Sequence, residues 1–106
     1  MPIAGTGEET AFDHFIDQVK RRYQPQKVLL FGSRARGEAS PNSDYDLLVV
    51  ASTFEGTKLT DRATEIYRTW PLWAGLDCIC LTPAEFERSR RKVSIVREID
   101  REGIAL

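Results

Sequence analysis

Two aspartates, Asp44 and Asp46, lie at the start of an apolar run that continues to Ala51. Successive side chains of a β-strand point to opposite faces, so these two carboxylates are expected on the same side. Carboxylates held side by side next to a buried strand repel each other and are costly to desolvate. A divalent cation removes both penalties, and Mg²⁺ is commonly held by one or two carboxylates together with phosphate oxygens. The competing interpretation is a solvated turn in which Asp44 acts as a cap.

A third carboxylate, Asp77, interrupts another apolar run, Leu76–Leu81, close to its start. A carboxylate in such a place is expensive unless it faces a metal ion or an arginine. We therefore expect Asp77 to join the other two aspartates at one edge of a sheet. A salt bridge from Asp77 to an arginine, such as Arg34 or Arg36, is the alternative.

The segment Gly32–Arg36 carries groups that suit a phosphate. Gly32 follows an apolar run and allows a ligand to approach the backbone closely, and the amides of a helix start suit phosphate oxygens. Ser33 adds a hydroxyl donor, and the forked guanidinium groups of Arg34 and Arg36 match phosphate geometry. Many turns share this pattern, so the prediction of a phosphate site depends on the neighbouring aspartates.

Two other motifs that bind metals or phosphates are excluded. Asn42, Asp44 and Asp46 have the opening alternation of a calcium loop. That loop requires Gly at its sixth position and Glu at its twelfth, where this sequence has Leu47 and Thr53. A Walker A loop is excluded as well, because no Gly-Lys-Ser/Thr follows the first glycine.

The elements that must position these residues alternate between helices and strands. Apolar spacing predicts helices at 8–23 and 59–70, a helix that begins at Thr82-Pro83-Ala84-Glu85, and a last one through Val93, Val96 and Ile99 that stops at Gly103. Apolar runs predict strands at 27–31, 45–51 and 76–81.

The positions of the candidate residues fix the direction of each predicted strand. The first strand ends at Gly32 and the second begins at Asp44, so these two strands should be antiparallel. The helix 59–70 then returns the chain, so the third strand should run parallel to the second. We expect an α/β (α+β) fold, with a small mixed sheet of three to four strands and about four helices.

Length and composition place the chain among single small domains. We expect a flexible tail at residues 1–7 and one domain at 8–106. No membrane span or secretory signal is recognised, which favours a cytoplasmic protein. The 15 Lys and Arg residues nearly balance 16 Asp and Glu residues, which argues against direct nucleic-acid binding. The sequence leaves open whether the protein forms a homo-oligomer.

Three large apolar residues, Trp70, Leu72 and Trp73, surround Pro71 before the third strand. We expect them to cap the core. A docking surface for another chain is the second interpretation. A basic run at 88–92 is expected to be a solvated turn or helix face.

Gly32-Ser33, ten intervening residues and then Asp44-Tyr45-Asp46 resemble the motif of the DNA polymerase β-type nucleotidyltransferase superfamily. The resemblance covers nearly the whole chain and is strongest to the minimal nucleotidyltransferases, which are often antitoxins encoded beside a HEPN-domain toxin. It implies a polymerase β-like nucleotidyltransferase fold. It also implies the transfer of AMP from ATP to a hydroxyl with one or two Mg²⁺ ions.

The resemblance also implies a role for each matching residue. Asp44 and Asp46 would hold Mg²⁺, and Asp77 would hold the metal nearest the acceptor and help to remove its proton. The terminal phosphates and the leaving pyrophosphate would contact Gly32, Ser33, Arg36 and Arg34. The implied acceptor is a tyrosine hydroxyl of the HEPN toxin, whose adenylylation silences it.

Two alternatives to a transferase that modifies a toxin belong to other functional classes. The protein could be a catalytically idle antitoxin that blocks its toxin by binding alone. It could also transfer a nucleotide to a small molecule, although such relatives usually need a further domain for the acceptor.

Overall fold

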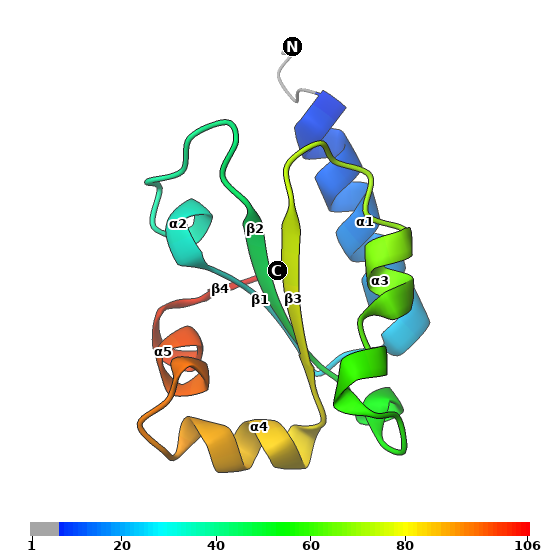
Figure 1. The fold of residues 1–106 in the computed structure, drawn as a ribbon, viewed down its shortest axis with the longest axis vertical. Coiled ribbons are helices and arrows are strands. Elements are labelled where there is room, and N and C mark those ends of the chain that lie inside the picture. The colour runs from blue at the N-terminus through cyan, green and yellow to red at the C-terminus, as the bar shows by residue number, and fades with distance from the viewer. Residues whose placement is uncertain (1–6) are drawn as a thin grey trace.

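The protein is described by a computed structural model that covers residues 7–106 (Figure 1). Of the predicted tail, residues 1–6 lie outside the described part, and Gly7 is the first residue of α1. Within residues 7–106, none of the helices has both the length and the apolar character needed to cross a bilayer.

One mixed sheet forms the centre of the molecule (Figure 1). Its strands are β1 (Lys27–Phe31), β2 (Tyr45–Val50), β3 (Leu76–Leu81) and β4 (Ile104–Ala105). They lie in the order β3-β2-β1-β4. β1 runs antiparallel to β2 and β4, and β3 runs parallel to β2. The predicted strand directions are therefore confirmed.

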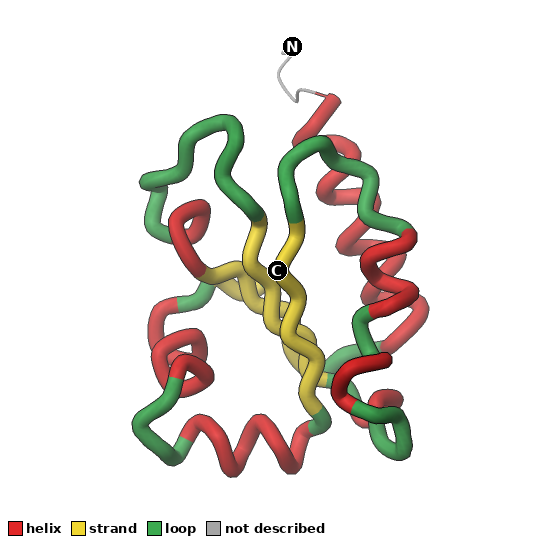
Figure 2. Tube along the Cα trace, in the orientation of Figure 1, coloured by secondary structure: helices red, strands yellow, loops and turns green. Residues whose placement is uncertain are grey.

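Helices cover both faces of this sheet (Figure 2). They are α1 (Gly7–Tyr23), α2 (Gly32–Ala35), α3 (Thr64–Arg68), α4 (Pro83–Arg90) and α5 (Ile95–Glu102), with 3₁₀ turns η1 (Ser52–Phe54) and η2 (Leu59–Asp61). Alternate residues of β2 serve the two faces. Leu47 and Val49 pack in the cluster under α1 and α3, whereas Leu48 and Val50 pack in the cluster under α4 and α5.

The start of α4 follows the predicted pattern. Thr82 is the N-cap, and its side-chain oxygen accepts a hydrogen bond from the Glu85 amide at 3.2 Å. Glu85 reaches back to the Thr82 amide at 2.8 Å, which completes a capping box. The carboxylate of Glu85 also pairs with the buried guanidinium of Arg62 at 2.6 Å. The helix start is thus tied to the segment before α3.

The predicted single helix 59–70 is wrong in its extent. The structure divides it into η2 and the short helix α3. Arg62 lies between the two, and its guanidinium donates hydrogen bonds to the carbonyls of Thr57 and Cys80 and to Glu85. These tertiary contacts of one buried arginine override the helical spacing of the segment.

The last helix also begins later than predicted. Ser94 caps α5 by accepting a hydrogen bond from the Arg97 amide at 3.3 Å, so the helix starts at Ile95. Val93 therefore lies before the helix and is exposed. Gly103 ends α5, as predicted.

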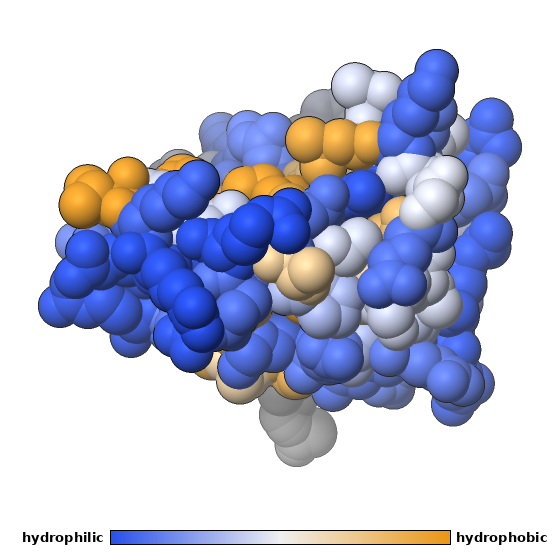
Figure 3. Space-filling view, turned by 90° about the horizontal axis from the view of Figure 1, so that it is seen from below, coloured by the Kyte–Doolittle hydropathy of each residue, from blue (hydrophilic) through white to orange (hydrophobic). Residues whose placement is uncertain are grey.

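The basic run 88–92 covers the last turn of α4 and the two residues after it, and its charged side chains lie at the surface. Arg90 and Arg91 pair with Glu87 one helical turn away, each at 2.9 Å. The surface at this end of the molecule is largely hydrophilic, with separate apolar side chains (Figure 3). The prediction of a solvated helix face is confirmed.

Candidate active site

The transition from β1 to α2 brings the backbone against a carboxylate. Gly32 opens α2 with a φ of +75°, a conformation that suits glycine. A Cβ added at Gly32 would overlap the carboxylate of Asp46. Phe31 and Asp46 are register partners in β1 and β2. Only glycine therefore allows the turn and the carboxylate to lie so close together.

Asp46 and Asp77 lie opposite each other in the parallel pair β2 and β3. Burial raises the pKa of Asp46, and the neighbouring carboxyl groups of Asp77 and Asp44 raise it further. Arg36 acts in the opposite direction on the pKa of Asp46, and Asp77 is exposed to solvent.

Asp44 lies just before β2, against Gly75. It is exposed, and a Cβ added at Gly75 would lie 2.6 Å from its Oδ1 atom. The amide of Tyr45 donates to the Gly75 carbonyl at 2.9 Å, which joins the start of β2 to the entry of β3. Within residues 7–106, no three Asp, Glu, His or Cys side chains are already gathered as a metal-ligand set.

The chemistry of these side chains fits Mg²⁺ better than a softer metal. All three candidates offer carboxylate oxygens, the ligands that Mg²⁺ prefers. A cation would also relieve the repulsion that raises the pKa of Asp46. The donors therefore fit the ion, although their arrangement is incomplete.

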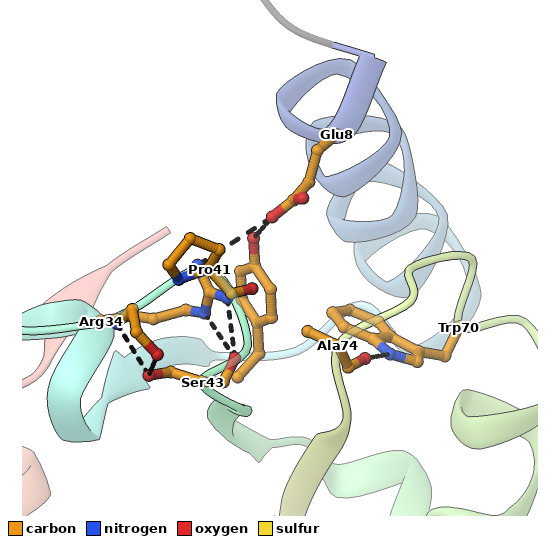
Figure 4. A network of polar contacts seen from close by, with 8 residues as sticks. Glu8, Arg34, Pro41, Ser43, Trp70 and Ala74 are labelled. Carbon is orange, nitrogen blue, oxygen red and sulfur yellow. Dashed lines mark hydrogen bonds and ion pairs between the residues drawn. The ribbon is translucent and has the colours of Figure 1, made fainter.

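Arg34 forms hydrogen bonds with the loop between α2 and β2 (Figure 4). Its Nε and Nη2 atoms donate to the Ser43 carbonyl at 3.1 and 2.7 Å. Its guanidinium carbon lies 3.8 Å from the ring centroid of Tyr45. Tyr45 and Asp46 point to opposite faces of β2, so Arg34 lies away from the Asp46 side. Its observed contacts hold the loop, and its predicted phosphate contact stays a prediction.

Tyr45 lies between the two aspartates of the motif and anchors them. Its hydroxyl donates to Glu8 of α1 at 2.6 Å, and its ring stacks on Phe12 with centroids 4.9 Å apart. Burial and the bond to Glu8 raise the pKa of Tyr45 to about 12. The residue therefore stays neutral and fixes the strand from the face opposite to Asp46.

Arg36 and Ser33 are the other side chains that the sequence predicts to bind phosphate. Arg36 is exposed, and its Nε atom pairs with Glu38 at 2.8 Å. The Glu38 contact raises the pKa of Arg36, and the charge of Asp46 acts in the same direction. An exposed pair of this kind is weak, so Arg36 is available to an incoming phosphate. Ser33 is half-buried within α2.

A pocket of about 260 Å³ opens beside this turn, between α2 and α5. Gly32 and Arg36 form part of its wall, together with Ile95 and Ile99. Glu98 and Glu102 also line the pocket, whereas Ser33 and Asp46 do not.

Sequence patterns did not single out two residues that shape this site. Tyr45 links β2 to Glu8 of α1 through its hydroxyl. Gly75 is the residue against which the Asp44 carboxylate rests. Such contacts join segments far apart in the chain, and no local spacing reveals them.

Comparisons with known proteins identify the family. A family model described as a nucleotidyltransferase domain matches residues 13–102. The chain therefore belongs to the nucleotidyltransferase domain family. The fold and the family expected from the sequence are confirmed.

Three relatives show how far the similarity extends. Over 45 residues the chain is 42% identical to a Methanocaldococcus jannaschii protein named "Putative protein adenylyltransferase", and this match covers 41% of the chain and 45% of that relative. A structure described as a "putative minimal nucleotidyltransferase" is 26% identical, with a TM-score of 0.58 and coverage of 97% and 99% of the two chains.

The third relative is a structure of a "putative nucleotidyltransferase" from Sulfolobus solfataricus. It has a TM-score of 0.62 at 23% identity, over 91% of this chain and 76% of that one, and shows the fold alone. The chain spans less than half the length of its curated relative.

Proposed function

We propose that this protein transfers AMP from ATP to a tyrosine hydroxyl of a HEPN-domain toxin and thereby acts as its antitoxin. The observation that carries the catalytic part is the position of Asp46, which lies against the Gly32 turn on one side and opposite Asp77 on the other. The turn to which we assign phosphate binding and the pair of aspartates thus lie at one edge of the sheet.

In the proposed reaction, the acceptor oxygen forms a bond to the α-phosphorus while the bond from that phosphorus to the bridging oxygen of pyrophosphate breaks. Asp77 accepts the proton of the hydroxyl. The backbone at Gly32 and the Ser33 hydroxyl hold the terminal phosphates, and Arg36 offsets the charge of the leaving pyrophosphate. Arg34 contributes by holding the loop between α2 and β2 through the Ser43 carbonyl and the Tyr45 ring.

Asp44, Asp46 and Asp77 would hold Mg²⁺. When bound, the ion supplies charge neutralisation and Lewis-acid polarisation of the phosphate oxygens. The protein's own contribution is to hold Asp46 against the turn and to keep Asp77 beside it. Catalysis of this kind depends mainly on positioning and electrostatics, so the loss of either carboxylate should nearly abolish transfer.

Two lines of support bear on the acceptor. The name of the curated relative supports a protein as the acceptor class. The HEPN toxin is supported by the resemblance of the motif residues Gly32-Ser33 and Asp44-Tyr45-Asp46 to minimal nucleotidyltransferases that act as antitoxins.

The experiment is a transfer assay with the HEPN-domain protein encoded beside this chain. ATP radiolabelled at the α-phosphate should label that protein in the presence of Mg²⁺, whereas ATP labelled at the γ-phosphate should not. Asp46→Asn should remove the labelling, and Asp13→Asn, a change of an exposed residue on α1, should leave it intact. Binding of ATP by the native protein without label on the neighbour would contradict the proposal and favour an idle partner-binding module. Label on a small molecule instead would favour the other alternative.

A further inference from the structure

The segment that leads into β3 holds a tryptophan entirely in solvent. Trp73 is 97% exposed, whereas its neighbours Trp70 and Ala74 are part of the packed interior. The prediction that Trp73 would cap the core is therefore wrong. Trp70 does so, with its ring 4.9 Å from that of Phe15.

The loop that carries Trp73 is fixed at both ends. The indole Nε1 atom of Trp70 donates to the Ala74 carbonyl at 2.7 Å (Figure 4), and the Gly75 carbonyl accepts from the Tyr45 amide at 2.9 Å. Gly75 in turn abuts the carboxylate of Asp44. A partner that contacts Trp73 would therefore meet a loop whose backbone is already held, with little entropy lost in ordering that backbone.

The sheet order places Trp73 on a defined side of the reacting atoms. The turn at α2 follows β1, on one side of β2, and the Trp73 loop enters β3, on the other side. In phosphoryl-type transfer the attacking and leaving oxygens lie roughly in line. If pyrophosphate leaves toward α2, the acceptor hydroxyl must approach from the β3 side, where Asp77 and the Trp73 loop lie (Figure 1).

The outer edge of β3 is not open for strand addition. The Tyr67 hydroxyl accepts a hydrogen bond from the Cys78 amide at 3.0 Å, and Arg62 donates to the Cys80 carbonyl at 3.2 Å. Side chains thus occupy backbone groups that an added strand would use. An acceptor on this side must be recognised through side chains, and exposed Trp is a residue type that dominates such contacts.

We propose that Trp73 is the residue that recognises the acceptor polypeptide, by packing against apolar side chains that surround the target hydroxyl. This inference rests on the proposed function. It adds that the contact is made to the acceptor and that the nucleotide is bound independently of Trp73.

The test measures transfer and nucleotide binding separately in Trp73→Ser, with the neighbouring HEPN-domain protein as acceptor. We expect kcat/KM for the acceptor to fall at least tenfold, with the dissociation constant for ATP and Mg²⁺ unchanged. Trp73→Phe should retain most of the transfer, because an aromatic ring remains. Val93→Ser is the matched control, since Val93 is 93% exposed but lies between α4 and α5. It should match the wild type in both measurements.

The outcomes separate this inference from the function on which it rests. Wild-type labelling that persists unchanged in Trp73→Ser would overturn the role of Trp73 and leave the transferase intact. An equal loss of ATP binding would assign Trp73 to the nucleotide and also overturn it. No labelling by the wild type would refute the proposed function, and the inference with it. A ¹⁹F NMR signal from 5-fluorotryptophan at position 73 should shift on addition of the acceptor and stay in place with ATP and Mg²⁺.

Discussion

At the residue scale, the molecule carries a charge arrangement that is unfavourable for folding. Asp46 is partly buried beside Asp77, and its pKa is raised because both burial and the neighbouring carboxylates disfavour its charged form. Proteins commonly keep such groups where their chemistry is needed. The same group that costs stability in the metal-free protein is the one that a bound cation would stabilise.

Replacing Asp46 with asparagine should therefore have opposite effects on stability and binding. In the absence of divalent cations, Asp46→Asn should raise the Tm by a few degrees, because a neutral amide removes the repulsion from Asp77 and Asp44. Addition of ATP and Mg²⁺ should raise the Tm of the wild type by an amount set by RT ln(1 + [L]/Kd) and leave the variant nearly unchanged. Thermal melts with and without the ligands measure both effects. An equal ligand-induced rise in the variant would contradict the role of Asp46.

Gly75 offers a second residue-scale prediction. Gly75→Ala should force the Asp44 carboxylate to move, because the new Cβ would lie 2.6 Å from its Oδ1 atom. We expect weaker binding of ATP with Mg²⁺ and a retained fold, measured by calorimetry and circular dichroism. Gly7→Ala is the matched control, since nothing lies within 4 Å of a Cβ added there. Unchanged binding by Gly75→Ala would show that the position of Asp44 is unimportant.

At the scale of elements, Arg34 joins the loop between α2 and β2 to the elements around it. Arg34 holds the Ser43 carbonyl with two donors and lies over the ring of Tyr45, which is itself bonded to Glu8 of α1. The network joins α2, the start of β2 and the first turn of α1 (Figure 4). The network thus fixes the positions of Asp44 and Asp46 relative to the turn at Gly32.

Arg34→Lys should loosen this loop, because lysine lacks the planar fork that holds Ser43 and covers Tyr45. We expect faster amide exchange in residues 36–44 and a roughly ten- to hundredfold loss of affinity for Mg²⁺ with ATP, typical of groups that position ligands. Hydrogen-exchange mass spectrometry and titration measure these effects. Arg68→Lys, a change in an exposed pair with Glu65, should alter neither. Slow exchange in the loop of Arg34→Lys would refute this positioning role.

Much of the element pattern could be predicted because it is encoded locally. The alternation of β2, the capping box at Thr82 and the stop at Gly103 all depend on neighbouring residues. The break between η2 and α3 could not be predicted, because the buried contacts of Arg62 reach Glu85 and Cys80 across the fold. For the same reason, the positions of the candidate aspartates followed from strand direction, whereas the separate resting place of Asp44 against Gly75 did not.

At the scale of the whole molecule, one ion pair joins the helix that begins after β3 to the segment before α3. The side chains of Arg62 and Glu85 are only 7% and 30% exposed, and their closest atoms lie 2.6 Å apart. The contact with Arg62 and the helix cap at Thr82 lower the pKa of Glu85 to about 2 from an ordinary value of 4.5. Because the folded-state value is the lower one, the pair stabilises the fold above pH 4.5, and that stabilisation is lost as the pH falls toward 2.

Glu85→Gln should lower the free energy of unfolding by about 2–4 kcal/mol near neutral pH, because it leaves Arg62 buried without its carboxylate. The difference from the wild type should shrink as the pH falls from 4.5 toward 2. Urea denaturation across this pH range measures both. Glu65→Gln, at a more exposed pair with Arg68, should cost less than about 1 kcal/mol. A difference that stays constant with pH would contradict the assignment.

We propose that the Gly32 turn and the carboxylates of Asp44, Asp46 and Asp77 surround one cation. Paramagnetic Mn²⁺ added with ATP to the ¹⁵N-labelled protein tests it directly, because the ion broadens the amide signals of nearby residues. We expect broadening of the amide signals of residues 32–33, 44–46 and 76–77. The signals of residues 20–27, which include the C-terminal end of α1 and the start of β1, should stay sharp. Broadening confined to another part of the molecule, or of only one of the three segments, would contradict the claim.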